Sequence, residues 1–215
     1  MIIAGIEEAG RGPVIGPMVM AICSIEDSKE HLLRKIGVKD SKLLSPLQRK
    51  RIFEEIKKLC KYKIIILLPK EIDLAVENPA INLNGLEART SAKLINKLEP
   101  RKVILDCPSN NPLNYKNYVK SMVKDKDIKI IAEHKADVNY PIVGAASILA
   151  KVTRDAEIEK LKKEHKVDFG SGYPSDPRTQ KFIKENWNKY DFFRKTWSTY
   201  KRIAQEKAQK GLGDF

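Results

Sequence analysis

Short runs of apolar residues alternate with polar turns along the first two thirds of the chain, and these runs predict β-strands. The glycine-rich segment Gly10 to Pro13 separates the first two runs, so we expect these two strands to form a hairpin. Pro69 and Asp106 each follow or close an apolar run and mark where a strand ends. The predicted strands cover residues 2–7, 14–25, 63–68, 102–106 and 128–132.

Between and after these runs the apolar residues recur at helical spacing. Ser45, Pro46 and Gln48 form a helix start, with serine as the N-cap and glutamine placed for a capping box. The helix behind them is expected to bury Ile52, Phe53, Ile56 and Leu59. Further helices are expected over residues 84–98, 113–124 and 141–165, and two more after Asp176.

The succession of strands and helices predicts an α/β fold with a mixed central sheet flanked by helices. Few strands are predicted near the last helices, so we expect these helices to form a separate C-terminal helical segment. The chain therefore divides into a core over residues 1–165, a helical segment over 166–208 and a tail over 209–215.

Composition narrows the class of protein. The 215 residues are 42% hydrophobic and 32% charged, which is typical of a soluble globular domain. No apolar run of about 18 residues and no signal-peptide pattern is present, so we expect a cytoplasmic protein without a membrane span. Cys23, Cys60 and Cys107 are scattered among apolar neighbours and are interpreted as reduced core residues rather than a disulfide set or a zinc site.

The formal net charge of +13 is large for this length. Such an excess favours a polyanionic partner, because positive charge raises affinity for nucleic acid without regard to sequence. A lysine-rich surface of the kind found in heat-adapted proteins is the alternative, and charge alone leaves both open.

Four acidic residues lie where predicted strands end. Glu7 and Glu8 close the first strand directly before a Gly-Arg-Gly turn, Asp106 closes the strand over 102–106, and Asp137 follows the strand over 128–132. Functional residues of open α/β sheets gather at strand ends, so these carboxylates could meet at one edge. Hard oxygen ligands suit magnesium or manganese better than zinc. A lone aspartate at such a place is more often a turn former or a helix cap.

Two other polar features accompany the acids. Ser147, Lys151 and Arg154 form one stripe on the otherwise apolar helix over 141–165, which requires an anionic neighbour. That neighbour is either a nucleic-acid backbone or a protein carboxylate such as Asp155. His134 is interpreted as a structural residue or one that supports a ligand.

Two loops complete the set of candidate binding segments. Lys39 to Lys42 offers a hydroxyl and two ammonium groups to a phosphate. The glycine- and proline-rich loop from Gly170 to Pro177 presents Tyr173, whose ring could stack on a base or a sugar. Core packing of Tyr173 is the alternative.

Four separate motifs, in this order, resemble ribonuclease HII, particularly its archaeal branch. They are GIEEAGRGPVIG over residues 5–16, VKDSK over 38–42, IAEHKADVNYPIVGAASILAKVTR over 131–154 and GSGYPSDPR over 170–178. The resemblance covers most of the chain. It implies an RNase H-like core over 1–165 and a substrate-binding function for the segment over 166–208. It also implies an endonuclease that cleaves RNA in RNA–DNA hybrids, including single ribonucleotides embedded in duplex DNA, and so a function in DNA replication and repair.

The resemblance also implies residue roles. Glu7, Glu8, Asp106 and Asp137 would bind Mg²⁺ or Mn²⁺ and carry catalysis. One ion would activate a water and the other would stabilise the leaving 3′-oxygen, so that cleavage 5′ of the ribonucleotide leaves 5′-phosphate and 3′-hydroxyl ends. The remaining roles are substrate contacts. The resemblance assigns recognition of the 2′-hydroxyl, largely through backbone, to Gly10, Arg11 and Gly12, and packing on the next sugar to Tyr173. It assigns phosphate binding to Ser41, Lys42, Ser147 and Lys151.

Glu7 departs from the family pattern, which usually has aspartate at this position. The extra methylene adds roughly 1.5 Å of reach, in a site whose two ions would lie only about 4 Å apart. Either the backbone compensates, or activity is reduced, or metal preference has moved toward manganese, or the residue is an engineered substitution. The alternative function is therefore a hybrid-binding protein with impaired catalysis. A different RNase H-like nuclease that cuts all-DNA duplexes is a third interpretation.

The C-terminal tail carries one more motif. Gln209, Leu212 and Phe215 have the spacing of a peptide that docks on the replication sliding clamp, with the two apolar residues entering one pocket. A frayed terminus is the alternative. No unclaimed apolar stripe suggests self-association, so we expect a monomer.

Overall fold

The computed structural model describes residues 1–38 and 44–212. Ser41, Lys42 and Phe215, and the side chain of Leu212, lie outside this described part. The elements in chain order are β1 Ile2–Ala9, β2 Met18–Glu26, the 3-10 helix η1 Asp27–Lys29, α1 His31–Lys35, α2 Pro46–Leu59, β3 Lys61–Leu67, α3 Pro69–Glu77, α4 Asn82–Leu98, β4 Lys102–Asp106, α5 Pro112–Met122, β5 Lys129–Glu133, α6 Ala136–Asn139, α7 Pro141–His165, α8 Pro177–Asn186 and α9 Ser198–Leu212.

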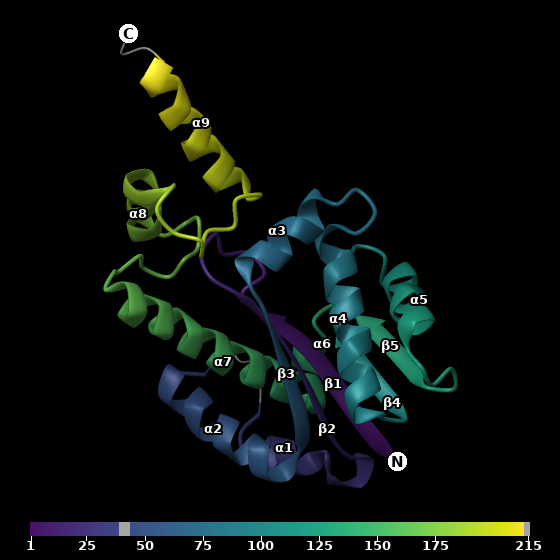
Figure 1. Ribbon diagram of the computed structural model, residues 1–215. Coiled ribbons are helices and arrows are strands. Elements are labelled where there is room, and N and C mark those ends of the chain that lie inside the picture. The colour runs from purple at the N-terminus through teal and green to yellow at the C-terminus, as the bar shows by residue number, and fades with distance from the viewer. Residues whose placement is uncertain (39–43, 213–215) are drawn as a thin grey trace.

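The strands form one mixed sheet in the order β3-β2-β1-β4-β5. β1 pairs antiparallel with β2, as the predicted hairpin requires, and parallel with β4. Helix α7 crosses one face of the sheet with α1 and α2, and α4 and α5 cover the other face (Figure 1). The predicted α/β class with a mixed sheet and a C-terminal helical segment is confirmed.

Side-chain alternation along the strands explains the two cores. Ile3 faces the α7 side, whereas Ala4 and Ile6 face the α4 side, because successive residues of a strand point to opposite faces. A third apolar cluster joins α8 and α9 to Val14, Ile15 and Ile158. The C-terminal segment therefore packs on the connection between β1 and β2 and on the distal part of α7.

The predicted second strand began four residues too early. It starts at Met18, because the preceding residues are bound by the C-terminal segment instead of by the sheet. Val14 N–H donates to Gly172 O, and Gly16 N–H donates to Phe192 O, each at 2.9 Å. Gly16 has a φ of +83°, a conformation that favours glycine.

Local chemistry at helix starts is confirmed where it was predicted. Ser45 and Gln48 form both hydrogen bonds of a capping box at the start of α2. Pro69 does end β3, but it also opens α3, which the sequence patterns missed. Leu59 was predicted to be buried and is 36% exposed, because α2 ends there.

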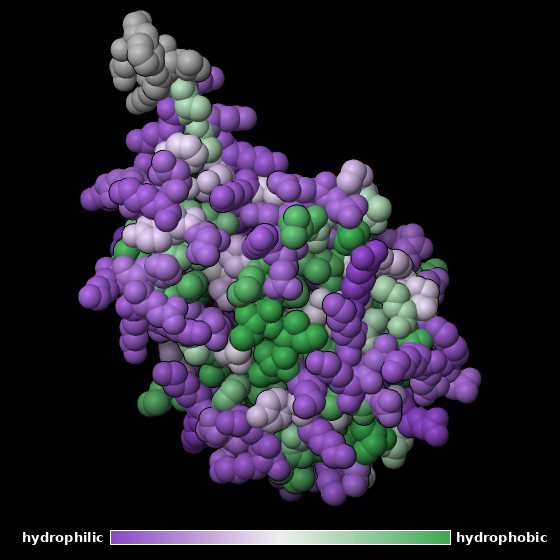
Figure 2. All heavy atoms as spheres, viewed as in Figure 1, coloured by the Kyte–Doolittle hydropathy of each residue, from purple (hydrophilic) through white to green (hydrophobic). Residues whose placement is uncertain are grey.

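Three further features concern the cysteines, the length of the helices and the edge of the sheet. Cys23, Cys60 and Cys107 are buried and free, as predicted. In the described residues, no helix has the length and apolar character that crossing a membrane requires. Strand β3 lies at the edge of the sheet, and Figure 2 shows hydrophobic surface gathered over this part of the molecule.

Candidate active site

The two adjacent acids at the end of β1 leave the strand toward opposite faces of the sheet, yet at this strand end their side chains are hydrogen-bonded to each other. Glu7 is four residues after Ile3 on the same strand and therefore lies, like Ile3, on the α7 side. There it is hydrogen-bonded to the side chain of Ser147. Glu8 lies on the α4 side, close to Arg11 and Glu87. One strand end therefore supplies a carboxylate to each side of the sheet edge.

Strand register brings a third acid alongside. Ile6 of β1 is the partner of Leu105 in the parallel β4, so Glu7 and Asp106 are the next positions on both strands. Asp106 Oδ1 accepts a hydrogen bond from Ala136 N–H at 2.8 Å. That bond joins the end of β4 to α6, a short helix that the sequence patterns did not predict.

Asp137 lies on α6 and not directly at a strand end. It is 8% exposed, and Lys135 before it has a φ of +59°, which turns the chain sharply after β5. His134, from the same turn, places Nδ1 3.1 Å from Cys107 O, so its contact is with backbone beside Asp106, in keeping with the predicted supporting role. The structure therefore groups Glu7, Glu8, Asp106 and Asp137, although two of them need the tertiary fold to meet.

Burial and mutual repulsion raise the pKa values of the two glutamates of this cluster. Burial raises the pKa of Glu7 well above its ordinary value, and Glu8, Asp106 and Asp137 raise it further. Burial raises the pKa of Glu8 to about 7, with a further contribution from Asp106. Carboxylates held together against their mutual repulsion are a frequent arrangement at functional sites.

The donor chemistry fits a hard divalent cation. Carboxylate oxygens are the groups that Mg²⁺ or Mn²⁺ binds, and a cation would relieve the repulsion that helps to raise the pKa values of Glu7 and Glu8. In the ranges 1–38 and 44–212, no three acidic, histidine or cysteine side chains are arranged as a ready-made coordination sphere. Glu7 and Asp106 instead bond to Ser147 and to Ala136 N–H.

The Gly-Arg-Gly turn is held from beneath by an arginine that sequence patterns missed. Arg194 is fully buried in the segment between α8 and α9. Its guanidinium donates to the carbonyls of Gly10, Arg11 and Gly16 at 2.6, 2.9 and 3.0 Å. Trp197 Nε1–H donates to Gly12 O at 3.1 Å.

This arrangement decides which groups of the turn remain available. In a trans peptide the carbonyl of one residue and the N–H of the next point in opposite directions. The carbonyls of Gly10 and Arg11 are directed at Arg194, so the N–H groups of Arg11 and Gly12 point the other way. Within the described part of the chain, neither N–H has a hydrogen-bond acceptor. The turn thus presents two adjacent backbone donors.

The side chain of Arg11 is held by protein groups. Its Nε donates to Glu87 Oε1 and its Nη2 to Asn84 Oδ1, both at 2.8 Å. Glu87 is fully buried on α4, and burial followed by repulsion from Glu8 raises its pKa to about 8. The Arg11 side chain is thus engaged with protein groups, so of this residue the backbone N–H is the donor directed away from Arg194. Asn84 and Glu87 were not predicted.

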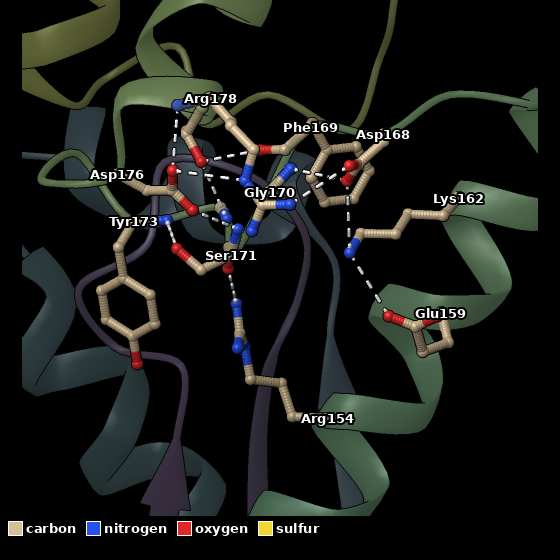
Figure 3. Close-up of polar contacts among 12 residues, drawn as sticks. Arg154, Glu159, Lys162, Asp168, Phe169, Gly170, Ser171, Tyr173, Asp176 and Arg178 are labelled. Carbon is tan, nitrogen blue, oxygen red and sulfur yellow. Dashed lines mark hydrogen bonds and ion pairs between the residues drawn. The ribbon is translucent and has the colours of Figure 1, made fainter.

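Tyr173 lies beside the glycine turn. A Cβ added at Gly12 would lie 3.7 Å from Tyr173 Cε1, and the tyrosine is 38% exposed, so the alternative of core packing is wrong. Figure 3 shows its ring pointing away from the polar network that fixes its loop. In that network the Asp176 carboxylate accepts from Ser171 N–H at 2.8 Å and from Arg178 N–H at 2.9 Å.

The polar stripe on α7, formed by Ser147, Lys151 and Arg154, lies beside the glycine turn and the Tyr173 loop. Ser147 is buried against Glu7, whereas Lys151 is partly exposed, and Asp155 pairs with Arg49 at 3.9 Å. Arg154 is 5% exposed and lies between the turn and the Tyr173 loop. A Cβ at Gly10 would come within 2.5 Å of Arg154 Nε, so this glycine is required by the close approach.

Known proteins with similar sequences belong to one family. The sequence matches the family described as Ribonuclease HII over residues 4–200. It is 46% identical over 218 residues to Ribonuclease HII of Pyrococcus furiosus, covering 98% of this chain and 95% of the relative.

Two solved structures are also similar. The crystal structure of ribonuclease H2 from Pyrococcus horikoshii has a TM-score of 0.86 and 42% identity, covering 96% of this chain and 98% of the other. A structure of the PCNA:RNase HII complex from Archaeoglobus fulgidus has a TM-score of 0.84 and 40% identity, with 94% and 96% covered.

Proposed function

The chain belongs to the ribonuclease HII family, and from this premise we propose that it cuts on the 5′ side of ribonucleotides embedded in duplex DNA. It is a metal-dependent type 2 ribonuclease H that acts on RNA–DNA hybrids. The observation that carries the finer proposal is that the N–H groups of Arg11 and Gly12, next to Tyr173, have no hydrogen-bond acceptor among the described residues. Backbone donors suit an oxygen such as the ribose 2′-hydroxyl, which distinguishes RNA from DNA.

Each group of the site then has a defined task. The turn orients the ribonucleotide, and the Tyr173 ring packs on the sugar that follows it, so that the RNA-to-DNA junction is selected. Lys151 of α7, together with Ser41 and Lys42 outside the described part, binds phosphate oxygens. Ser147, which we also assigned to phosphate, contacts Glu7, and that contact supports a role in holding the carboxylate.

Glu7, Glu8, Asp106 and Asp137 would hold the divalent cations, Mg²⁺ or Mn²⁺. Bound there, two ions would supply an activated water and stabilisation of the leaving 3′-oxygen, giving 5′-phosphate and 3′-hydroxyl products. The protein contributes the positions of the four acids, the burial that excludes bulk water, and the in-line orientation of the scissile phosphate.

The test is cleavage of a DNA duplex carrying one ribonucleotide, in magnesium and in manganese, by the unaltered chain and by Glu7→Asp. We expect the unaltered chain to cut 5′ of the ribonucleotide and to leave an all-DNA duplex intact. Binding without cleavage, rescued by Glu7→Asp, would instead establish the alternative of a catalytically impaired hybrid-binding protein. Failure of both variants to cut would refute the assignment of the acids.

A second proposal concerns the tail. Helix α9 projects from the body of the molecule (Figure 1), and residues 205–209 are exposed. Such an arm suits presentation of Gln209, Leu212 and Phe215 to a sliding clamp, and the similar Archaeoglobus protein was solved as a PCNA complex. Deleting residues 209–215 should abolish clamp binding without changing the cleavage of short substrates. Lys201→Ala, earlier on the same helix, should leave both unchanged.

A further inference from the structure

A groove of about 990 Å³ runs between α2 and the distal half of α7 and ends at the Tyr173 loop. Seven cationic side chains line it, against three carboxylates. Each of the three acids already has a cation: Asp155 pairs with Arg49, Glu159 with Lys162 and Glu164 with Lys160. The surplus of positive charge is therefore not neutralised within the groove.

Four cations make up the surplus: three lysines along the length of the groove and Arg154 at its inner end. Lys50 on α2 and Lys151 and Lys163 on α7 line the groove, and none of them has an ion pair with a described residue. Lys50 and Lys163 are exposed to solvent. Their ammonium groups are thus available to an anionic ligand.

The inner end of the groove contains a buried cation with an unused donor. Arg154 is 5% exposed, and its Nε has no acceptor among the described residues. Its Nη2 reaches Ser171 O at 3.5 Å, and its guanidinium carbon lies 5.4 Å from the centre of the Tyr173 ring. Figure 3 shows Arg154 directed from α7 toward the loop that carries Tyr173. The positive groove is therefore continuous with the substrate-binding surface.

The direction of the groove follows from the order of groups on α7. Along α7, Ser147 contacts Glu7 of the acidic cluster, Lys151 comes next and Lys163 lies furthest away, and Tyr173 lines the groove from the following loop. If the ribonucleotide occupies the glycine turn and the next sugar packs on Tyr173, the groove receives the strand on the 3′ side of the junction. Lys151 and Lys163 are separated by about 18 Å of helix. That length corresponds to roughly five steps of a duplex strand, at about 3.4 Å each.

We propose that the α2–α7 groove binds the sugar–phosphate backbone of the DNA on the 3′ side of the ribonucleotide, over about five nucleotides. The proposal rests on the proposed function, because the junction sets the register. The continuity with Lys151 and Tyr173 favours nucleic acid over an acidic protein segment. The groove would add affinity without sequence preference.

The test is a binding titration in EDTA, so that cleavage does not intervene. Two duplexes share one embedded ribonucleotide and one long 5′ flank, and their 3′ flanks are about ten and about two base pairs, chosen to exceed and to miss the groove length. Lys50→Ala/Lys163→Ala is compared with Lys57→Ala/Lys58→Ala. The control pair removes the same charge from α2, at lysines that are already paired with Glu54 and Glu55 and do not line the groove.

On the long 3′ flank we expect the groove variant to bind roughly tenfold more weakly near 0.1 M salt, and its log–log salt slope to fall by about two. On the short 3′ flank it should bind like the unaltered chain, and the control variant should match the unaltered chain on both duplexes. Equal binding by both variants on the long flank would overturn the proposal. So would a loss that persists on the short flank, since it would place the contacts elsewhere. Absence of cleavage by the unaltered chain is a separate outcome, and it would count against the proposed function instead.

Discussion

The raised pKa values of the acidic cluster predict that metal binding depends steeply on pH. A carboxylic acid must lose its proton before it can ligate a divalent cation, so binding displaces any proton that is present. Glu8 has a pKa of about 7 in the metal-free protein, and that of Glu7 is raised well above 4.5. At pH 6 Glu8 is therefore largely protonated, and at pH 8 it is largely ionised.

The magnitude follows from Glu8 alone. For a group with a pKa near 7, the apparent affinity is almost unreduced at pH 8 and falls about tenfold at pH 6, or about 1.4 kcal/mol. Glu7 adds to this loss, because its pKa is also raised. We therefore expect Mn²⁺ to bind at least about tenfold more weakly at pH 6 than at pH 8.

The stability of the metal-free protein depends on pH in the opposite direction to its metal affinity. An acid whose pKa is raised by folding favours the protonated folded state, so the free energy of unfolding falls as pH rises from about 4.5 through about 7. The metal-free protein should thus melt lower at pH 8 than at pH 6, while the increase in melting temperature caused by Mn²⁺ should be larger at pH 8.

Calorimetric titration with Mn²⁺ at pH 6, 7 and 8, in buffers of different ionisation enthalpy, measures both the affinity and the protons released. Glu55→Gln, at a partly exposed acid on α2 that pairs with Lys58, serves as the control and should leave the profile unchanged. An affinity that changes by less than about threefold between pH 6 and pH 8, with no proton release, would refute the inference that these acids are protonated and bind the metal.

Other substitutions have equally definite expectations. Gly5→Ala should lower the free energy of unfolding by about 3 kcal/mol or more, since its Cβ would lie 2.5 Å from backbone atoms of Ile142; a thermal melt within 2 °C of the unaltered chain would contradict this. Gly12→Ala has room for its Cβ, so its melt should be nearly unchanged while affinity for a ribonucleotide-containing duplex falls; undiminished binding would argue against close approach of substrate to the turn. Arg194→Met leaves three carbonyls without their donor and should cost about 3 kcal/mol in urea unfolding, whereas a cost below about 1 kcal/mol would show that the turn does not depend on it. Glu87→Gln removes a buried acid with a pKa of about 8. The metal-free variant should therefore be more stable than the metal-free unaltered chain, by a difference in unfolding free energy that grows above pH 5. A difference independent of pH would exclude ionisation of buried Glu87 as its cause.

Local sequence determined those parts of the molecule whose causes are themselves local. The capping box at Ser45, the span of α7 from Pro141 to His165 and the strand Lys102–Asp106 follow from residues a few positions apart. The glycine turn next to Glu7 and Glu8 was also evident, since glycine and paired acids in such a context are informative without any partner. The separate motifs together were specific enough to indicate the family.

Only the tertiary structure decided how these parts cooperate. Arg194 is more than 180 residues from the carbonyls of Gly10 and Arg11 that it holds, and no local pattern distinguishes it from the other arginines. Glu87 becomes informative only because α4 packs where Arg11 and Glu8 lie. Asp137 reaches the other acids through a helix of four residues, which periodicity does not detect. Hydrogen bonds and charge repulsion act through space over a few ångströms, so long-range contacts determine which polar residues form the site, whereas backbone propensity and capping act along the chain and are legible in the sequence alone.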